Sequence, residues 1–134
     1  MRVAAIAVTV LTLLLPVQDG AVYFRDEVTL TGEFLWEHMN HTGDLHAVFT
    51  KTGDSAWGVE FQFVWEGELH VYRGTAEGSM TDGELRGNVV TDNPARPQTF
   101  FFAGRFERGR FAGAHAALQA SGATYPTGTL TLGR

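Results

Sequence analysis

The sequence predicts an all-β protein, an eight-stranded antiparallel up-and-down meander that closes into a small barrel. Past residue 20, apolar and polar residues alternate in short runs, and no segment has helical periodicity. Such alternation is typical of strands that bury one face. Glycine-containing turns separate the runs, and every connection is short, which favours antiparallel pairing of neighbours. A β-sandwich of the same strands is the alternative. The eight runs are 28–37, 44–50, 56–65, 68–79, 84–91, 98–107, 110–117 and 127–132.

The first 20 residues differ in composition from these runs. Arg2 is followed by an apolar stretch over 3–15, which Pro16 ends. This stretch is shorter than the roughly 20 apolar residues that cross a bilayer. A cation, a short apolar stretch and a breaker predict a secretory signal peptide at 1–20, with a buried N-terminal strand or helix as the alternative. The single barrel domain then spans 21–134, and we expect no membrane insertion of the mature chain.

The 134-residue chain contains no cysteine. An exported domain without disulfides must be stabilised by its core alone, which is more typical of a bacterial envelope protein than of a eukaryotic secreted one. We therefore expect an exported, soluble protein that is periplasmic or secreted and of bacterial origin. The formal net charge of -5 argues against a nucleic-acid partner.

Turn signals separate the runs. A loop around 38–43 follows the first, and the two prolines of 93–97 indicate a loop after the fifth, because proline cannot donate to a strand ladder. Two-residue hairpin turns are predicted at Glu66-Gly67, Asp82-Gly83 and Arg108-Gly109. Folding the chain about these turns predicts these opposed pairs: Phe63 with His70, Phe61 with Tyr72, Glu60 with Arg73, Met80 with Leu85, Gly78 with Gly87, Ala76 with Val89, Glu107 with Arg110, Phe106 with Phe111, Gly104 with Gly113, and Phe102 with His115.

The predicted pairings agree about which side of the sheet is apolar. Directly opposed residues share a face, so the aromatic residues of 56–65 select one apolar face on 68–79, which in turn selects one on 84–91. Charged and amide side chains collect on the other face. Closure into a barrel is favoured because acids concentrate near the first strand and arginines near the last ones, and closure brings the two regions together.

In architecture, such a barrel resembles the calycin-type barrels, lipocalins and avidins, which bind one small ligand. The Gly-x-Trp that opens the first lipocalin strand is absent, because Gly32 and Trp36 have a different spacing. A small, largely apolar or aromatic ligand is expected at the barrel end with the longer loops. Glycines 78, 87, 104 and 113 offer the only evident room inside the barrel. The candidate lining is Trp36, Trp57, Phe61, Phe63, Tyr72, Phe102 and His70.

All five histidines map to this same end of the predicted barrel. His38, His70 and His115 are expected to face inward at the rim, where three imidazoles from different strands could approach one another. Three histidines with an open position can hold Zn²⁺ or another divalent metal. The alternative is that these side chains are half-buried and hydrogen-bonded, with no metal. No other cofactor is expected.

Two further alternatives concern the role of the whole domain. An eight-stranded barrel is only just wide enough for its own side chains, so a filled barrel could act as a structural or protein-interaction module through its outer surface. Catalysis is not expected, because Ser55, Ser79 and Ser121 lie in or beside turns without a motif that activates a nucleophile.

Overall fold

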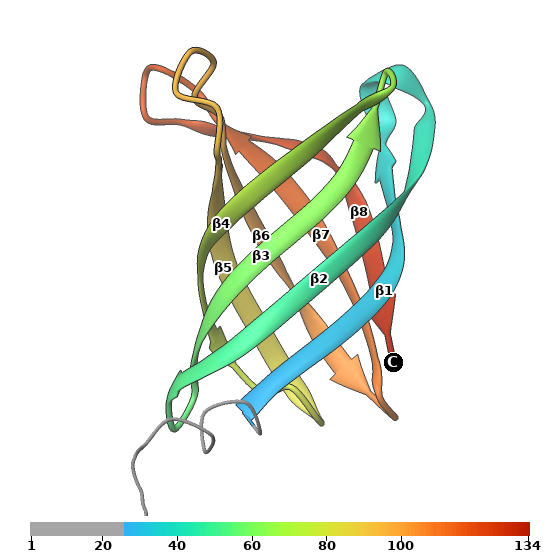
Figure 1. Cartoon of the computed structure of the whole chain (residues 1–134), viewed down its shortest axis with the longest axis vertical. Coiled ribbons are helices and arrows are strands. Elements are labelled where there is room, and N and C mark those ends of the chain that lie inside the picture. The colour runs from blue at the N-terminus through green and yellow to red at the C-terminus, as the bar shows by residue number, and fades with distance from the viewer. Residues whose placement is uncertain (1–25) are drawn as a thin grey trace, which may run out of the picture.

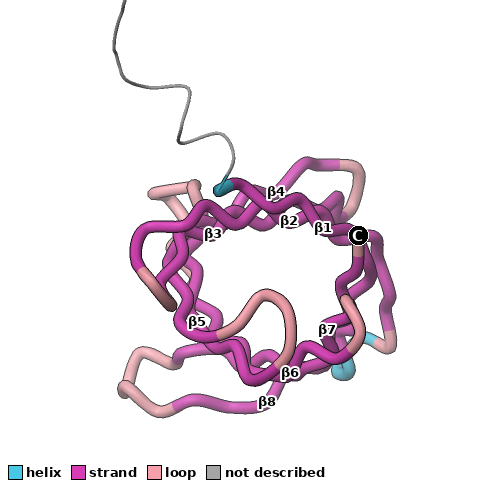
Figure 2. The backbone as a smooth tube through the Cα atoms, turned by 90° about the horizontal axis from the view of Figure 1, so that it is seen from below, coloured by secondary structure: helices cyan, strands magenta, loops and turns pink. Residues whose placement is uncertain are grey.

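The computed structural model describes residues 26–134, and they form one closed β-barrel (Figure 1). Eight antiparallel strands follow one another in chain order, and the last pairs with the first. The predicted meander is thus confirmed, and Figure 2 shows its strands as a closed ring rather than two separate sheets. The predicted signal peptide at 1–20 lies outside the described residues. The elements are β1 (Glu27–Trp36), η2 (Glu37–Met39), β2 (His41–Gly53), β3 (Ala56–Trp65), β4 (Glu68–Gly78), β5 (Gly83–Thr91), β6 (Thr99–Glu107), β7 (Arg110–Leu118) and β8 (Thr124–Gly133).

The barrel closes through the backbone ladder between β1 and β8. This ladder runs from Thr31 opposite Gly133 to Trp36 opposite Gly128. The expected attraction between acidic first and basic last strands does not take the form of ion pairs, because none of those found within residues 26–134 joins β1 to β8. Gly32 contributes instead: a Cβ there would collide with the backbone of β8, so only glycine permits this close approach.

Two of the three predicted hairpins have the expected register. In the β3–β4 hairpin Phe63 lies opposite His70, and in the β6–β7 hairpin Phe106 lies opposite Phe111. Both turns place two consecutive residues in the left-handed region: Glu66 has φ 52 and its following glycine φ 79, with nearly the same values in the 108–109 turn. This is the backbone of the two-residue type I′ turn, which leaves the register no freedom.

The predicted register of the β4–β5 hairpin was wrong by two residues. Gly78 lies opposite Leu85 rather than Gly87. The turn is wider than expected because the hydroxyl of Ser79 accepts backbone N–H groups from Thr81 at 3.1 Å and Asp82 at 3.0 Å. A shift of two residues returns each side chain to the same face. The predicted inner and outer faces are therefore correct despite the error.

The base of the barrel, the end formed by turns 54–55, 79–82 and 108–109, is solidly packed. Met80 from the second turn is only 5% exposed. Gly104 and Gly113 do not leave room for a ligand, because the ring of Phe111 lies against both, within 3 Å of where a Cβ would be. The largest fully buried side chains all lie in this half: Leu30, Phe49, Leu85, Phe106, Phe111 and Leu132.

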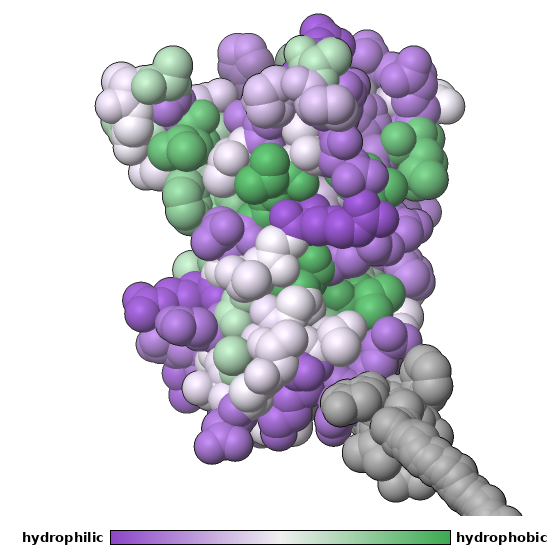
Figure 3. Space-filling model, turned by 60° about the vertical axis from the view of Figure 1, so that its left-hand side comes forward, coloured by the Kyte–Doolittle hydropathy of each residue, from purple (hydrophilic) through white to green (hydrophobic). Residues whose placement is uncertain are grey.

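The outer face of the barrel is mainly polar. On the side shown in Figure 3, apolar groups form separate patches between polar ones. Two ion pairs join Arg73 on β4 to Glu60 at 2.9 Å and to Asp92 at 2.7 Å. In the described part of the chain, no helix is long and apolar enough to cross a membrane.

Candidate ligand-binding cavity at the barrel mouth

The mouth of the barrel, the end formed by segments 37–40, 66–67, 92–98 and 119–123, contains a cavity of about 620 Å³. In Figure 1 these connections gather at the upper end of the molecule. The barrel is therefore divided into a packed base and a hollow mouth. The cavity is lined by Phe34, Trp36, Met39, Leu45, Phe61, Phe63, Trp65, Glu66, Glu68, His70, Tyr72, Val89, Arg96, Gln98, Phe100, Phe102, His115 and Leu130.

Seven aromatic rings form a chain of contacts that closes on itself, which we call the aromatic collar. Neighbouring ring centroids lie between 4.5 and 6.3 Å apart, within the range of favourable offset and edge-to-face pairs. Six of the seven also line the cavity. In contact order the members are Trp36, Phe100, Tyr72, Phe63, Phe34, His41 and Trp65, which returns to Trp36.

A glycine on β2 allows the collar to span three strands. Phe34 on β1 and Phe63 on β3 are separated by β2, yet their ring centroids lie only 5.0 Å apart. Gly43 makes this possible, because a Cβ there would lie 2.7 Å from the Phe34 ring. The ring occupies the space above the glycine and forms part of the cavity wall.

Polar groups enter the cavity mainly at its rim. Glu66 lies in the β3–β4 turn, Glu68 begins β4, and Arg96 lies in the β5–β6 loop, all with exposed side chains. Within residues 26–134 none of the three forms an ion pair. Deeper in the cavity, burial raises the pKa of the Tyr72 hydroxyl above its ordinary value of 10.0, against the effect of a hydrogen bond with the Thr91 side chain. Tyr72 is therefore neutral at physiological pH.

His115 is held by hydrogen bonds on both ring nitrogens. Its Nδ1 lies 2.6 Å from Thr127 Oγ1, and its Nε2 lies 3.0 Å from the carbonyl oxygen of Leu35. The Leu35 carbonyl can only accept, so Nε2–H donates to it, and in the neutral ring Nδ1 accepts from the Thr127 hydroxyl, whose oxygen also lies 3.0 Å from the His115 carbonyl oxygen. Burial lowers the pKa of His115, while the Leu35 carbonyl and the charge of Glu37 act in the opposite direction. This side chain therefore connects β7 and β8 to β1 across the seam where the barrel closes.

Five of the six aromatic residues that the sequence suggested as ligand contacts line the cavity: Trp36, Phe61, Phe63, Tyr72 and Phe102. Trp57 does not. It lies near the base, at the start of β3, where its indole N–H donates to the carbonyl oxygen of Gly78 at 3.1 Å. In a meander the third strand runs from base to mouth, so the position of Trp57 in its strand already indicated the wrong end.

The same reasoning identifies lining residues that sequence analysis did not select. Trp65 is the last residue of β3, at the opposite end of that strand from Trp57. Phe34 lies two positions before Trp36 and Phe100 lies two positions before Phe102, so both point inward as these residues do. Their spacing by two from inward residues was the available signal. The rim groups Glu66, Glu68, Arg96 and Gln98 had no such signal, because they lie in or beside turns.

The structure does not bring His38, His70 and His115 together as metal ligands. His38 is exposed on η2, His70 stacks on Phe63 at 5.4 Å, and both nitrogens of His115 are hydrogen-bonded. His41 belongs to the aromatic collar instead. Over residues 26–134, no group of three His, Asp or Glu side chains is arranged to hold a metal ion.

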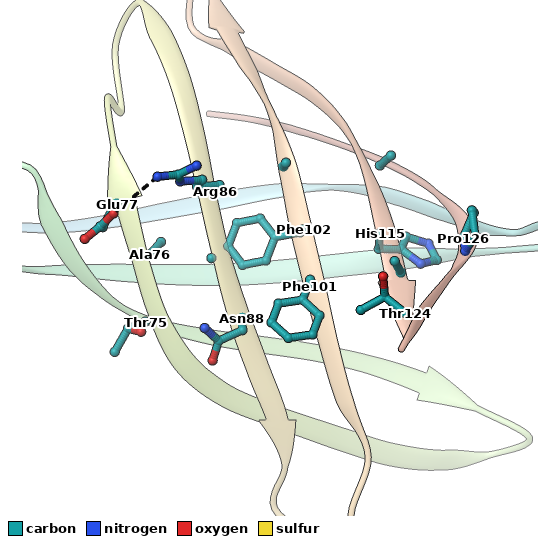
Figure 4. Close-up of a pocket in the computed structure, with 14 residues that line it drawn as sticks. Thr75, Ala76, Glu77, Arg86, Asn88, Phe101, Phe102, His115, Thr124 and Pro126 are labelled. Atoms are coloured by element: carbon teal, nitrogen blue, oxygen red, sulfur yellow. Dashed lines mark ion pairs between the residues drawn. The ribbon is translucent and has the colours of Figure 1, made fainter. Parts of the chain in front are cut away.

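An outer groove, also of about 620 Å³, lies on the barrel wall formed by β4 to β8 (Figure 4). Small side chains such as Ala103 and Ala114 form part of it, and Phe101 is a partly exposed ring beside them. At one edge Glu77 and Arg86 form an exposed ion pair at 4.0 Å. The groove contains fewer aromatic groups than the mouth, and its charged groups are paired with each other.

The mouth cavity is therefore the candidate functional site, because it combines aromatic walls with a few charged groups at one opening. Its rings come from strands that are fixed by a continuous ladder. Comparisons with known protein families, with curated proteins and with solved structures find no match to this chain.

Proposed function

We propose that the protein is an exported β-barrel that binds one small, largely apolar or aromatic ligand in its mouth cavity. The observation that carries this proposal is the division of the barrel interior. Fully buried side chains fill the base, whereas about 620 Å³ at the mouth is left open between aromatic rings. Sites for small ligands commonly have volumes of about 300–1,000 Å³, apolar walls and few polar groups.

The collar supports this proposal because it is already ordered. Its rings pack against one another, so binding would immobilise few side chains and lose little conformational entropy. A ligand would cover the exposed parts of rings such as Phe63 and Phe100, which are partly buried. A single-ligand barrel of this kind is similar in architecture to the calycin-type barrels, and we extend their mode of binding to this chain as part of the proposal.

Export is the second part of the proposal, and it is supported by the sequence alone. Residues 1–20 have the order of a signal peptide, and the chain has no cysteine. The intact mass of the protein purified from its native host tests this part. A mature chain that begins near residue 21 supports export, and an intact cellular chain that begins at Met1 contradicts it.

Binding can be measured with N-phenyl-1-naphthylamine, a neutral aromatic probe whose fluorescence rises in apolar surroundings. The three tryptophans provide a position-sensitive readout, because Trp36 and Trp65 line the cavity and Trp57 lies near the base. We expect saturable binding with quenching of tryptophan emission. Trp36→Phe should remove a large part of that quenching, whereas Trp57→Phe should retain it.

A variant in the outer groove separates the two possible locations of the probe. Phe101→Ala removes the partly exposed ring there and leaves the mouth unchanged. If Phe101→Ala abolishes binding while Trp36→Phe does not, the probe occupies the outer groove and the proposal is wrong. Absence of saturable binding by the folded wild-type barrel contradicts it as well.

A further inference from the structure

We infer that the ligand of the mouth cavity is a cation, an apolar or aromatic body that carries a substituted ammonium group. The inference rests on the proposed function, because it names the chemical class of the ligand for the same cavity. Two features of the mouth carry it: the aromatic faces and the charges at the rim.

The aromatic collar is suited to a positive charge. The face of an aromatic ring carries partial negative charge, and a cation within about 6 Å of a ring centroid is attracted to it, most strongly when water is excluded. In the cavity wall the ring of Phe100 contacts Trp36 on one side and Tyr72 on the other. Phe63 stands next to Tyr72 at 5.6 Å. Several rings around one space is how proteins recognise quaternary ammonium groups.

The charges at the rim favour the same sign. The lining contains two carboxylates, Glu66 and Glu68, and one guanidinium, Arg96, which leaves one net negative charge from these three groups (-2 + 1). The carboxylates lie two residues apart beside a rigid turn, whereas Arg96 belongs to a seven-residue loop. Glu37, on η2 at the same end, also favours the protonated form of His115. A mouth of negative potential concentrates cations.

An anion would be repelled by this rim, where two carboxylates outnumber one guanidinium. Arg96 is exposed, so its guanidinium is hydrated at the rim. A cation requires no donors, because the ring faces stabilise it directly.

Isosteric probes isolate the effect of charge. Phenyltrimethylammonium and tert-butylbenzene have the same shape and differ by the substitution of N⁺ for carbon, and benzenesulfonate supplies an anion. Each is measured by displacement of N-phenyl-1-naphthylamine from the wild-type barrel. We expect the cation to displace the probe at about tenfold lower concentration than tert-butylbenzene, the effect of one or two desolvated cation–ring contacts.

Charge-neutralising variants test the role of the rim. Glu66→Gln combined with Glu68→Gln should reduce the preference for the cation severalfold and leave the affinity for tert-butylbenzene unchanged. The matched control combines Glu27→Gln with Glu84→Gln, which removes the same charge from exposed positions near the base. This control should keep the preference, and added salt should reduce it in the wild type.

The outcomes separate this inference from the proposed function. If tert-butylbenzene displaces the probe as well as the cation does, or if benzenesulfonate is preferred, the inference is overturned while the mouth remains a binding site. An unchanged preference in the Glu66→Gln, Glu68→Gln protein also overturns it. If no probe binds to the folded barrel, the proposed function itself fails.

Discussion

Leu130 and Leu132 offer a direct test of the division between packed base and hollow mouth. They lie two residues apart on β8, face inward together, and are only 3% and 1% exposed. Leu130 borders the mouth cavity. Leu132 lies in the base, opposite Phe111 on β7 and Gly32 on β1. The two leucines therefore differ mainly in whether open space already lies beside them.

Truncation to alanine should destabilise the two positions to different extents. Each substitution removes three carbon atoms, and at about 0.8 kcal/mol per carbon the lost transfer free energy is about 2.4 kcal/mol. At Leu130 the vacated volume joins an existing cavity, so we expect a loss near that value. At Leu132 a new closed cavity adds to the loss, and we expect about 4 kcal/mol, within the usual Leu→Ala range of roughly 2.7–5 kcal/mol.

Urea unfolding followed by far-ultraviolet circular dichroism measures both losses, with m-values compared to exclude a change in the denatured state. Titration with N-phenyl-1-naphthylamine gives a second readout, since Leu130→Ala should alter probe affinity and Leu132→Ala should not. Equal losses of stability, or a larger loss at Leu130, would refute the division of the interior.

Two further predictions concern pH and cavity volume. Burial holds the pKa of His115 below 6.5, so as the pH falls below that value the unfolded chain binds protons that the folded barrel does not, and the free energy of unfolding decreases. Urea titrations at about pH 7.5 and about pH 5 measure this loss. His115→Gln should lose less stability on acidification than the wild type, whereas His46→Gln, a control at an exposed position, should lose as much as the wild type. Equal losses in all three proteins would contradict this prediction. Gly43→Ala should push the Phe34 ring into the cavity and weaken probe binding severalfold with little loss of stability, because the displaced atoms are the end of a side chain. Gly113→Ala, whose Cβ would collide with the backbone of the neighbouring strand as well as a ring, should instead destabilise the barrel and leave the affinity of the folded fraction unchanged; the reverse order would contradict the geometry.

The fold could be predicted because short turns transmit register. At Glu66-Gly67 and Arg108-Gly109 the turn has two residues, so each fixes the partner of every residue in its hairpin. At Ser79 the side chain bonds to the backbone of the turn and widens it, which the Asp-Gly signal did not indicate. The faces were still correct, because only an odd shift exchanges them.

The candidate site was less predictable because it depends on how side chains share the interior. Alternation shows that Phe61 and Phe111 point inward, but it does not show that Phe111 fills the space beside two glycines while Phe61 borders a cavity. The partners of His115 were also hidden. They depend on a register shift in the β7–β8 ladder near Thr127 and on Leu35, which is 80 residues away in the chain. Such distant contacts cannot be read from local spacing.

The separation of base from mouth has an evolutionary consequence. Residues such as Leu30, Phe49 and Phe106 hold the strands together at one end, so substitutions among the rings at the other end leave those contacts intact. The residues around the opening can then change while the arrangement of the strands is kept. Protein engineers could therefore randomise the residues at the mouth and keep the packed base unchanged.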